Sequence, residues 1–144
     1  MTTTSSVGAL ADLHLHTHFS DGTDAPERVV ELAAQAGLSI IAITDHDNTE
    51  ALPLAAPAAK RHGIELIPGI EMSASAEGEE VHVLGFFLDV DNRALRQHLA
   101  EQQARRVERV REMVKRLEQA GVAIDAEEVF AVAGPGTVGR PHVA

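Results

Sequence analysis

The sequence predicts an α/β fold built on a parallel sheet, because short apolar runs alternate with helical patterns over its first 90 residues. The apolar runs cover residues 9–15, 38–44 and 64–70, and the helical patterns between them cover 24–37 and 49–62. Strands connected through helices lie parallel, either in an open sheet or in a barrel. In such folds the functional residues lie at the carboxyl ends of the strands.

The first helix is predicted from signals at both of its ends. Asp24 and Glu27 have the spacing of a capping box, and Pro26 suits the first turn. Gly37 is expected to end this helix. The apolar residues between these signals share one helical face: Val29, Leu32, Ala33 and Ala36.

The next elements are read from composition and from glycines. The β-branched run 38–44 is typical of a strand covered on both faces. A second helix is expected over 49–62, although Pro53 and Pro57 obscure its start, and it ends before Gly63. A third strand is expected over 64–70 and a fourth over 81–88.

The composition changes after residue 91. Residues 92–120 are rich in Glu, Gln and Arg with apolar residues at helical spacing, and a second capping box of Asp125 and Glu128 predicts a short helix to Ala133. We therefore divide the chain into a first part of the sheet fold over 9–90 and a helical insertion over 91–139.

The two ends of the sequence give further expectations. Residues 1–8 are expected to be a loose tail and do not have the pattern of a signal peptide. Pro141 is placed as at the start of a new helix, so we expect residues 140–144 to open a second part of the fold in a longer protein.

Composition limits the classes of function. The formal net charge of −10 disfavours direct binding of nucleic acid without bound cations or a local basic patch. Cysteine is absent, so a metal could bind only through nitrogen and oxygen. Trp and Tyr are also absent, which predicts an aliphatic core. No apolar stretch approaches the ~20 residues that a membrane span needs, and we expect a cytoplasmic protein.

The run from Asp12 to Gly22 contains the first candidate site. His14 and His16 alternate with leucines at the end of the first predicted strand, and Asp21 follows in Ser-Asp-Gly. Side chains at positions i and i+2 of a strand point to the same side, so both imidazoles can face one point. Imidazoles that converge with a carboxylate are the composition of a site for zinc, manganese or iron.

Three further motifs follow the later strands. Thr44-Asp45-His46-Asp47 comes after the second strand, Gly69-Ile70-Glu71 closes the third, and His82 lies in the fourth. Together with the opening run, these motifs resemble the PHP (polymerase and histidinol phosphatase) family of metal-dependent phosphoesterases. The resemblance covers residues 10–91 and 139–144.

The resemblance implies the N-terminal part of a distorted (βα)7 barrel that holds up to three divalent metals at its carboxyl-terminal mouth. It assigns the ligands as His14 and His16 with Glu71, Asp21 with His46, and Glu71 again with His82 and His142. Two more ligands, an Asp and a His, are expected beyond Ala144. Mn²⁺ is the metal expected first, with Zn²⁺, Fe²⁺ and Mg²⁺ as alternatives.

The resemblance also implies the function. A helical insertion before Gly-Arg-Pro-His is most similar to bacterial phosphoesterases that cleave nucleoside 3′,5′-bisphosphates and trim short RNA from the 5′ end. In this hypothesis a metal-bound hydroxide attacks phosphorus, the insertion caps the mouth, and Arg140 binds a substrate phosphate. The expected partner is a nucleotide or short oligonucleotide, with no stable protein partner.

Two alternatives stay open. Histidinol phosphatase belongs to the same family, but Asp21 stands where that activity would favour a histidine. A metal-binding PHP module without catalysis, as in DNA polymerases, is disfavoured because the ligand positions present are filled.

Other polar residues have structural interpretations. Asp12, Asp45 and Asp47 could orient ligands or serve local structure, and for Asp47 we favour a cap of the next helix. Arg140 could instead form a surface salt bridge. The arginines of 105–116 could contact an oligonucleotide, but we interpret them as a solvated helix face. The remaining histidines are expected to be structural: His18, His62 and His98.

Overall fold

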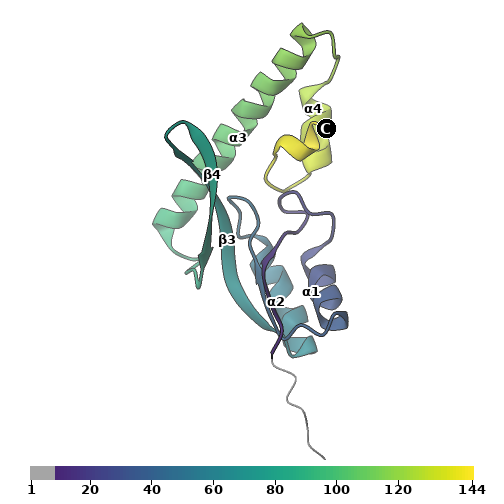
Figure 1. The fold of residues 1–144 in the computed structure, drawn as a ribbon, viewed down its shortest axis with the longest axis vertical. Coiled ribbons are helices and arrows are strands. Elements are labelled where there is room, and N and C mark those ends of the chain that lie inside the picture. Colours follow the sequence, from purple (N-terminus) through teal and green to yellow (C-terminus); the bar gives the residue numbers. More distant parts are fainter. Residues whose placement is uncertain (1–8) are drawn as a thin grey trace, which may run out of the picture.

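The strands of residues 9–144, the part of the chain described by a computed structural model, form one curled sheet (Figure 1). The predicted loose tail of residues 1–8 lies outside this part. The strand order is β1 (Ala11–Leu15), β2 (Ile40–Ile43), β3 (Glu65–Ala76) and β4 (Glu79–Phe86). β1, β2 and β3 pair in parallel, as the alternating pattern predicts, whereas β4 is antiparallel to β3.

The helices fall into two groups along the chain (Figure 1). α1 (Pro26–Gln35) and α2 (Ala51–His62) connect the parallel strands and lie beside them. α3 (Arg93–Gln119), α4 (Ala126–Ala133) and the short 3-10 helix η1 (Arg140–His142) follow the sheet. No helix within residues 9–144 has both the length and the apolar character needed to cross a bilayer. The observed architecture confirms the predicted α/β class.

The sheet and the first two helices share a mainly aliphatic core. Ile41 and Ile43 of β2 are almost fully buried against Val30 of α1. α2 contributes small residues, which let its backbone approach the strands closely: Ala51, Ala55, Ala58 and Ala59. The aliphatic core predicted from composition is confirmed, with Phe19 as an aromatic member.

The helical segment after the sheet has an apolar core of its own. Val110 and Val114 of α3 are buried against Val129 and Ala133 of α4, and Val138 of the following loop completes the cluster. A separate core is what a helical insertion requires, although the boundaries at residues 9–90 and 91–139 remain a prediction.

The two last strands form a longer hairpin than the sequence predicts. β3 continues to Ala76 instead of ending near residue 70, and β4 begins at Glu79. The two-residue turn of Glu77 and Gly78 has positive φ angles of 53° and 88°, which suit a tight hairpin with right-handed strand twist. The sequence does not predict this extension, because residues 73–80 contain no large apolar side chains that alternate with polar ones.

Two predicted helix starts have different outcomes. The capping box of Asp24 is wrong: Ala25 is the cap residue of α1, and the Asp24 carbonyl instead accepts a hydrogen bond from the His18 amide at 2.9 Å. Asp125 does cap α4, because its carboxylate accepts a hydrogen bond from the Glu127 amide. α2 begins at Ala51, and Pro57 lies inside the helix.

The loop after α4 lies against the loop after β1. The amide of Thr137 donates a hydrogen bond to the Phe19 carbonyl at 2.7 Å. A Cβ atom at Gly136 would lie 2.6 Å from the His18 carbonyl oxygen, so only glycine permits this approach. The contact holds the helical segment over the carboxyl ends of the strands.

Candidate metal centre

The carboxylate of Glu71 is the centre of a cluster of imidazoles. His14 Nε2 lies 2.9 Å and His16 Nε2 3.0 Å from Glu71 Oε2. His82 Nδ1 lies 2.7 Å from Glu71 Oε1, and His46 Nδ1 lies 3.7 Å from Oε2. The prediction that His14 and His16 face one point is confirmed, because both rings reach the same carboxylate oxygen.

The strands bring these residues together through backbone pairing. His46 forms an isolated parallel bridge with Glu71, in which the Asp47 amide donates to the Glu71 carbonyl at 3.0 Å and the Glu71 amide donates to the Asp45 carbonyl at 3.2 Å. His82 pairs with Ser73 and is therefore a diagonal neighbour of Glu71 across the hairpin. The sequence predicts Glu71 at the end of the third strand, but in the structure Glu71 lies inside β3.

A second carboxylate, that of Asp21, lies beside the first group. Asp21 Oδ1 is 3.1 Å from His16 Nδ1, and Asp21 Oδ2 is 3.4 Å from His46 Nε2. His16 and His46 therefore lie between the two carboxylates, with one ring nitrogen toward each. This arrangement brings Asp21 to His46, the pair that the resemblance implied.

Buried Asp45 holds the loop that carries Asp21. Its carboxylate accepts hydrogen bonds from the Thr17 amide, the Thr17 hydroxyl and the Ser20 hydroxyl at 2.7, 2.7 and 2.6 Å. Three donors satisfy this carboxylate, so its burial is compensated. Asp45 could orient ligands or serve local structure. In the structure its carboxylate contacts the loop that carries Asp21 and no candidate ligand directly, so it positions Asp21 through that loop.

The residues fit divalent metal ions. Within residues 9–144 three groups of side chains have ligand atoms within 4.8 Å of one another: His14, His16 and Glu71; His16, Asp21 and His46; and His46, Glu71 and His82. His46 Nδ1 is buried and has no hydrogen-bond partner in this part of the chain. A buried nitrogen without a partner is costly unless it binds a ligand, and nitrogen with carboxylate oxygen suits transition metals.

His142 lies outside these three groups. The Gly139 amide donates to its Nδ1 at 3.0 Å, which leaves Nε2 available. The group around Glu71 and His82 contains His46 instead, so the role of His142 as a ligand remains a prediction.

The charges in the cluster shift the ionisation of three groups. Hydrogen bonds to His16 and His46 hold the pKa of Asp21 well below its usual range. Burial lowers the pKa of His16, but the hydrogen bond and charge of Asp21, with the charges of Glu71 and Asp45, outweigh burial and raise it. Burial raises the pKa of Glu71, but hydrogen bonds from His14 and His82 outweigh burial and lower it. The cluster favours ionised carboxylates next to protonatable rings.

An arginine of α3 reaches into the site. Arg106 Nε lies 2.7 Å from Asp47 Oδ2, where the Asp47 side chain is fully buried and that of Arg106 is 13% exposed. Arg106 also donates to the Ser73 hydroxyl, and Asp47 accepts from the Ser73 amide at 2.9 Å. Asp47 therefore does not cap α2, and Arg106 does not lie on a solvated face.

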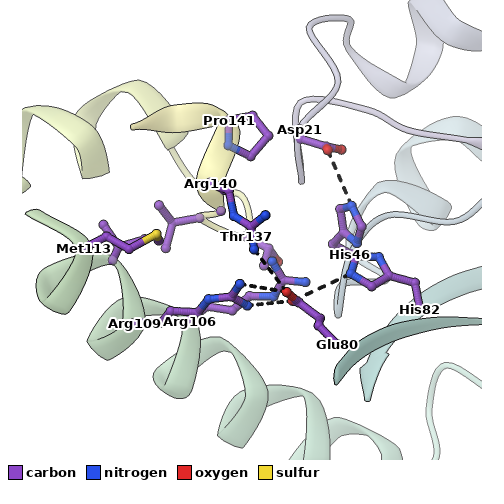
Figure 2. Close-up of a pocket in the computed structure, with 13 residues that line it drawn as sticks. Asp21, His46, Glu80, His82, Arg106, Arg109, Met113, Thr137, Arg140 and Pro141 are labelled. Carbon is purple, nitrogen blue, oxygen red and sulfur yellow. Dashed lines mark hydrogen bonds and ion pairs between the residues drawn. The ribbon is translucent and has the colours of Figure 1, made fainter. Parts of the chain in front are cut away.

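A cavity of about 260 Å³ opens beside the cluster (Figure 2). Asp21, His46 and His82 line one side, and α3 and the segment before η1 line the other. Figure 2 shows Arg109 and Arg140 turned toward Glu80 in this cavity. Sequence reasoning missed Glu80 and assigned Arg109 to a solvated helix face, which is wrong because Arg109 pairs with Glu80 of β4. Nothing in the spacing indicated that β4 and α3 meet.

The other histidines have the structural environments expected of them. The ring of His18 packs against Phe19 with 4.8 Å between centroids. His62 lies in the last turn of α2, where a cation is favourable. His98 Nε2 accepts from Gln102 one turn further along α3.

The α/β sheet gathers histidines and carboxylates into groups that could hold metal ions, which defines the class of a candidate metal-binding protein. Among known families, the PHP domain model matches residues 12–128. The chain belongs to the PHP domain family. The predicted resemblance is therefore confirmed.

Curated relatives have named activities. The 5′-3′ exoribonuclease Rnm of Salmonella typhimurium is 41% identical over 135 residues, which are 92% of this chain and 46% of that protein. The 3′,5′-nucleoside bisphosphate phosphatase of Chromobacterium violaceum is 41% identical over 112 residues, 78% of this chain and 39% of that protein. The chain thus spans less than half the length of these relatives.

A solved structure shares the fold. An amidohydrolase from Chromobacterium violaceum, solved with bound sulfate and without metal, superposes with a TM-score of 0.86 at 37% identity. The superposition covers 93% of this chain and 48% of that one. The chain therefore corresponds to about half of that protein, as the prediction of one part of a barrel requires.

The buried ion pair of Arg106 gives a testable prediction for stability. Arg106→Gln leaves the buried Asp47 carboxylate without its cation, and we expect a loss of about 3–5 kcal/mol in the free energy of unfolding, measured by urea denaturation. Arg96→Gln is the matched control on the same helix, because its pair with Asp91 is exposed and should change stability by less than about 1 kcal/mol. Equal stability of both variants would contradict the account.

The raised pKa of His16 predicts a pH dependence of metal binding. A proton and a metal ion compete for the same ring nitrogen. Because the pKa of His16 is raised, protonation begins to displace the metal at a pH above the ordinary value of about 6.5. We expect Mn²⁺ affinity, measured by calorimetry from pH 8 to pH 5.5, to fall as the pH is lowered, with proton release on binding. His98→Gln should keep the same profile. A flat profile would contradict the role of His16.

Proposed function

We propose that the protein is a metal-dependent phosphoesterase that hydrolyses a phosphate ester of a nucleotide, either a nucleoside 3′,5′-bisphosphate or the 5′ end of a short RNA. The observation that carries the proposal is the Glu71 carboxylate faced by four imidazoles beside an arginine-lined cavity. The two relatives named for these substrates share this part of their chains with it.

The metal ligands in this proposal are those of the three groups, with His142 as a further ligand: His14, His16, Asp21, His46, Glu71, His82 and His142. Bound divalent metals would supply the neutralisation of phosphate charge and a water of lowered pKa. We propose Mn²⁺ first, because mixed imidazole and carboxylate ligands suit it, with Zn²⁺, Fe²⁺ and Mg²⁺ as alternatives.

The chain's own residues perform the positioning. Asp45 fixes the loop of Asp21 through three hydrogen bonds, and Arg106 ties α3 to the chain segment that follows His46. The guanidinium of Arg140 lines the cavity, where it can bind a phosphate oxygen. α3 and the segment of residues 137–141 cover one side of the cavity and limit the size of the substrate.

The substrate class follows from charge and size. The chain carries a net charge of −10, but the wall of the cavity formed by α3 and the following segment has three arginines, so an anion is favoured there locally. The Chromobacterium violaceum structure was solved with bound sulfate, so a protein of this fold binds a tetrahedral anion. A cytoplasmic location and the absence of a stable protein partner remain predictions.

The proposed metal ligands can be tested by turnover. His16→Ala or Glu71→Ala in the full native chain should lower kcat on a nucleoside 3′,5′-bisphosphate more than about 100-fold, since even residues that only orient a ligand are worth 10–100-fold. His98→Ala is the control and should keep its activity, because His98 contacts Gln102 on α3. Unchanged turnover in both ligand variants would refute the metal assignment.

Parallel assays on other substrates separate the alternatives. Preferred turnover of histidinol phosphate would indicate the related phosphatase, and preferred cleavage of single-stranded DNA would indicate a polymerase-type module with nuclease activity. Metal binding without turnover of any of them would indicate a non-catalytic module.

A further inference from the structure

Glu80 binds two arginines in the cavity next to the metal centre (Figure 2). Arg109 Nη1 and Nη2 donate to Glu80 Oε1 and Oε2 at 2.6 and 2.7 Å, a bidentate pair. Arg140 Nη2 donates to Oε2 at 3.3 Å. The three side chains come from β4, α3 and η1, so they meet only in the folded chain.

The arrangement of the two arginines suits a phosphate as well as a carboxylate. A guanidinium forms the same bidentate contact with two oxygens of either group. Both carboxylate oxygens of Glu80 take part in this bidentate contact with Arg109. The carboxylate therefore occupies a site for which an external anion can compete.

Glu80 is able to leave this site. Its side chain is 34% exposed, that of Arg109 is 43% exposed, and that of Arg140 is 71% exposed. Ion pairs of such exposure are weak, so a phosphate that carries more charge than one carboxylate can displace Glu80. The side chain lies two residues from the Glu77-Gly78 turn, next to solvent.

The position of this pair relative to the metal centre is fixed by His82. His82 Nδ1 contacts Glu71, and His82 Nε2 lies 3.7 Å from Glu80 Oε1. The site held by Glu80 is thus one imidazole ring away from the metal ligands. A molecule that places one phosphate at the metal centre can place a second phosphate here.

A buried hydroxyl in the same cavity also lacks a partner. Thr137 is 3% exposed, and within residues 9–144 its Oγ1 has no hydrogen-bond partner. Thr137 lines the cavity together with Arg109 and Arg140. A buried hydroxyl without a partner is costly, which points to a polar ligand in the cavity.

We propose that Arg109 and Arg140 form a second anion subsite that Glu80 fills in the free protein and that the non-reacting phosphate of the substrate takes over. The inference rests on the proposed function and adds what selects the substrate. Glu80 sets the threshold: a nucleotide with two phosphates displaces it, and a nucleotide with one phosphate binds at the metal centre alone. Glu80 and Arg109 are therefore specificity-determining residues.

A different role for Glu80 would have a different signature. If its carboxylate served to orient His82, its removal would weaken metal binding, because such partners are worth 10–100-fold in metal affinity. In the subsite role, removal of Glu80 leaves the ligand atoms in place and changes the affinity for anions. The two roles separate when metal affinity and substrate preference are measured on the same variant.

The test compares adenosine 3′,5′-bisphosphate with adenosine 3′- and 5′-monophosphates on the full native chain. Glu80→Gln should lower the KM for the bisphosphate about two- to five-fold, which corresponds to an exposed ion pair. Arg109→Gln should raise the same KM about tenfold or more, because it removes charged hydrogen bonds. The preference for bisphosphate over monophosphate is expressed as the ratio of kcat/KM values. It should rise in Glu80→Gln and fall in Arg109→Gln.

Matched controls lie beside both residues. Glu79→Gln changes the neighbouring exposed carboxylate of β4, and Arg111→Gln changes an arginine of α3 that pairs with Glu108. Neither should alter the preference. An unchanged preference in Glu80→Gln and Arg109→Gln, or a loss of Mn²⁺ affinity in Glu80→Gln, would overturn the proposal.

A binding measurement keeps the inference separate from the proposed function. Inorganic phosphate titrated into chelator-treated protein should bind more tightly to Glu80→Gln and more weakly to Arg109→Gln than to the parent. This result would support the subsite even if none of the nucleotides were hydrolysed. Equal phosphate affinity in the three proteins would overturn the subsite whether or not the enzyme is active.

Discussion

The contact between the buried Glu71 carboxylate and the surrounding imidazoles is the interaction on which the rest of the site depends. Histidines from the end of β1, from the segment after β2 and from β4 converge on it. Burial of a carboxylate is costly unless hydrogen-bond donors or cations surround it. The site therefore requires that these segments keep one arrangement around Glu71. The backbone pairing between the His46 segment and β3, together with the hairpin, supplies that arrangement.

The fold could be predicted where apolar periodicity decides the structure. The three parallel strands and the helices between them follow from apolar runs and glycine stops, because burial of those runs drives the local structure. The extension of β3 beyond residue 70 could not be read in this way, since residues 73–76 have no large apolar side chain and are stabilised by pairing with β4. The capping box at Asp24 failed because the chain uses the Asp24 carbonyl to fix the loop at His18, a tertiary contact that local spacing does not reveal.

The site could be predicted where the ligands lie in short motifs next to strands. His14 and His16 are two residues apart in the sequence, so strand geometry alone places them together. The arginines are different: Arg106 meets Asp47 across 59 residues, and Arg109 meets Glu80 across 29. On a helix with an acidic and basic surface, charged residues are usually solvated, and only the packing of α3 against the hairpin and the His46 segment turns these two inward. An acidic protein thereby gains a local positive wall facing its metal ligands.

We expect Glu71 to be a ligand at more than one metal site, because it belongs to two of the groups that could hold a metal ion. Metal content, measured by elemental analysis after equilibration with Mn²⁺ and removal of free ion, tests it most directly when the parent is compared with Glu71→Gln. The account predicts more than one equivalent per chain in the parent and a loss of at least one equivalent in the variant, because two of the three ligand groups contain Glu71. Equal content in the two proteins, or no bound metal in the parent, would contradict it.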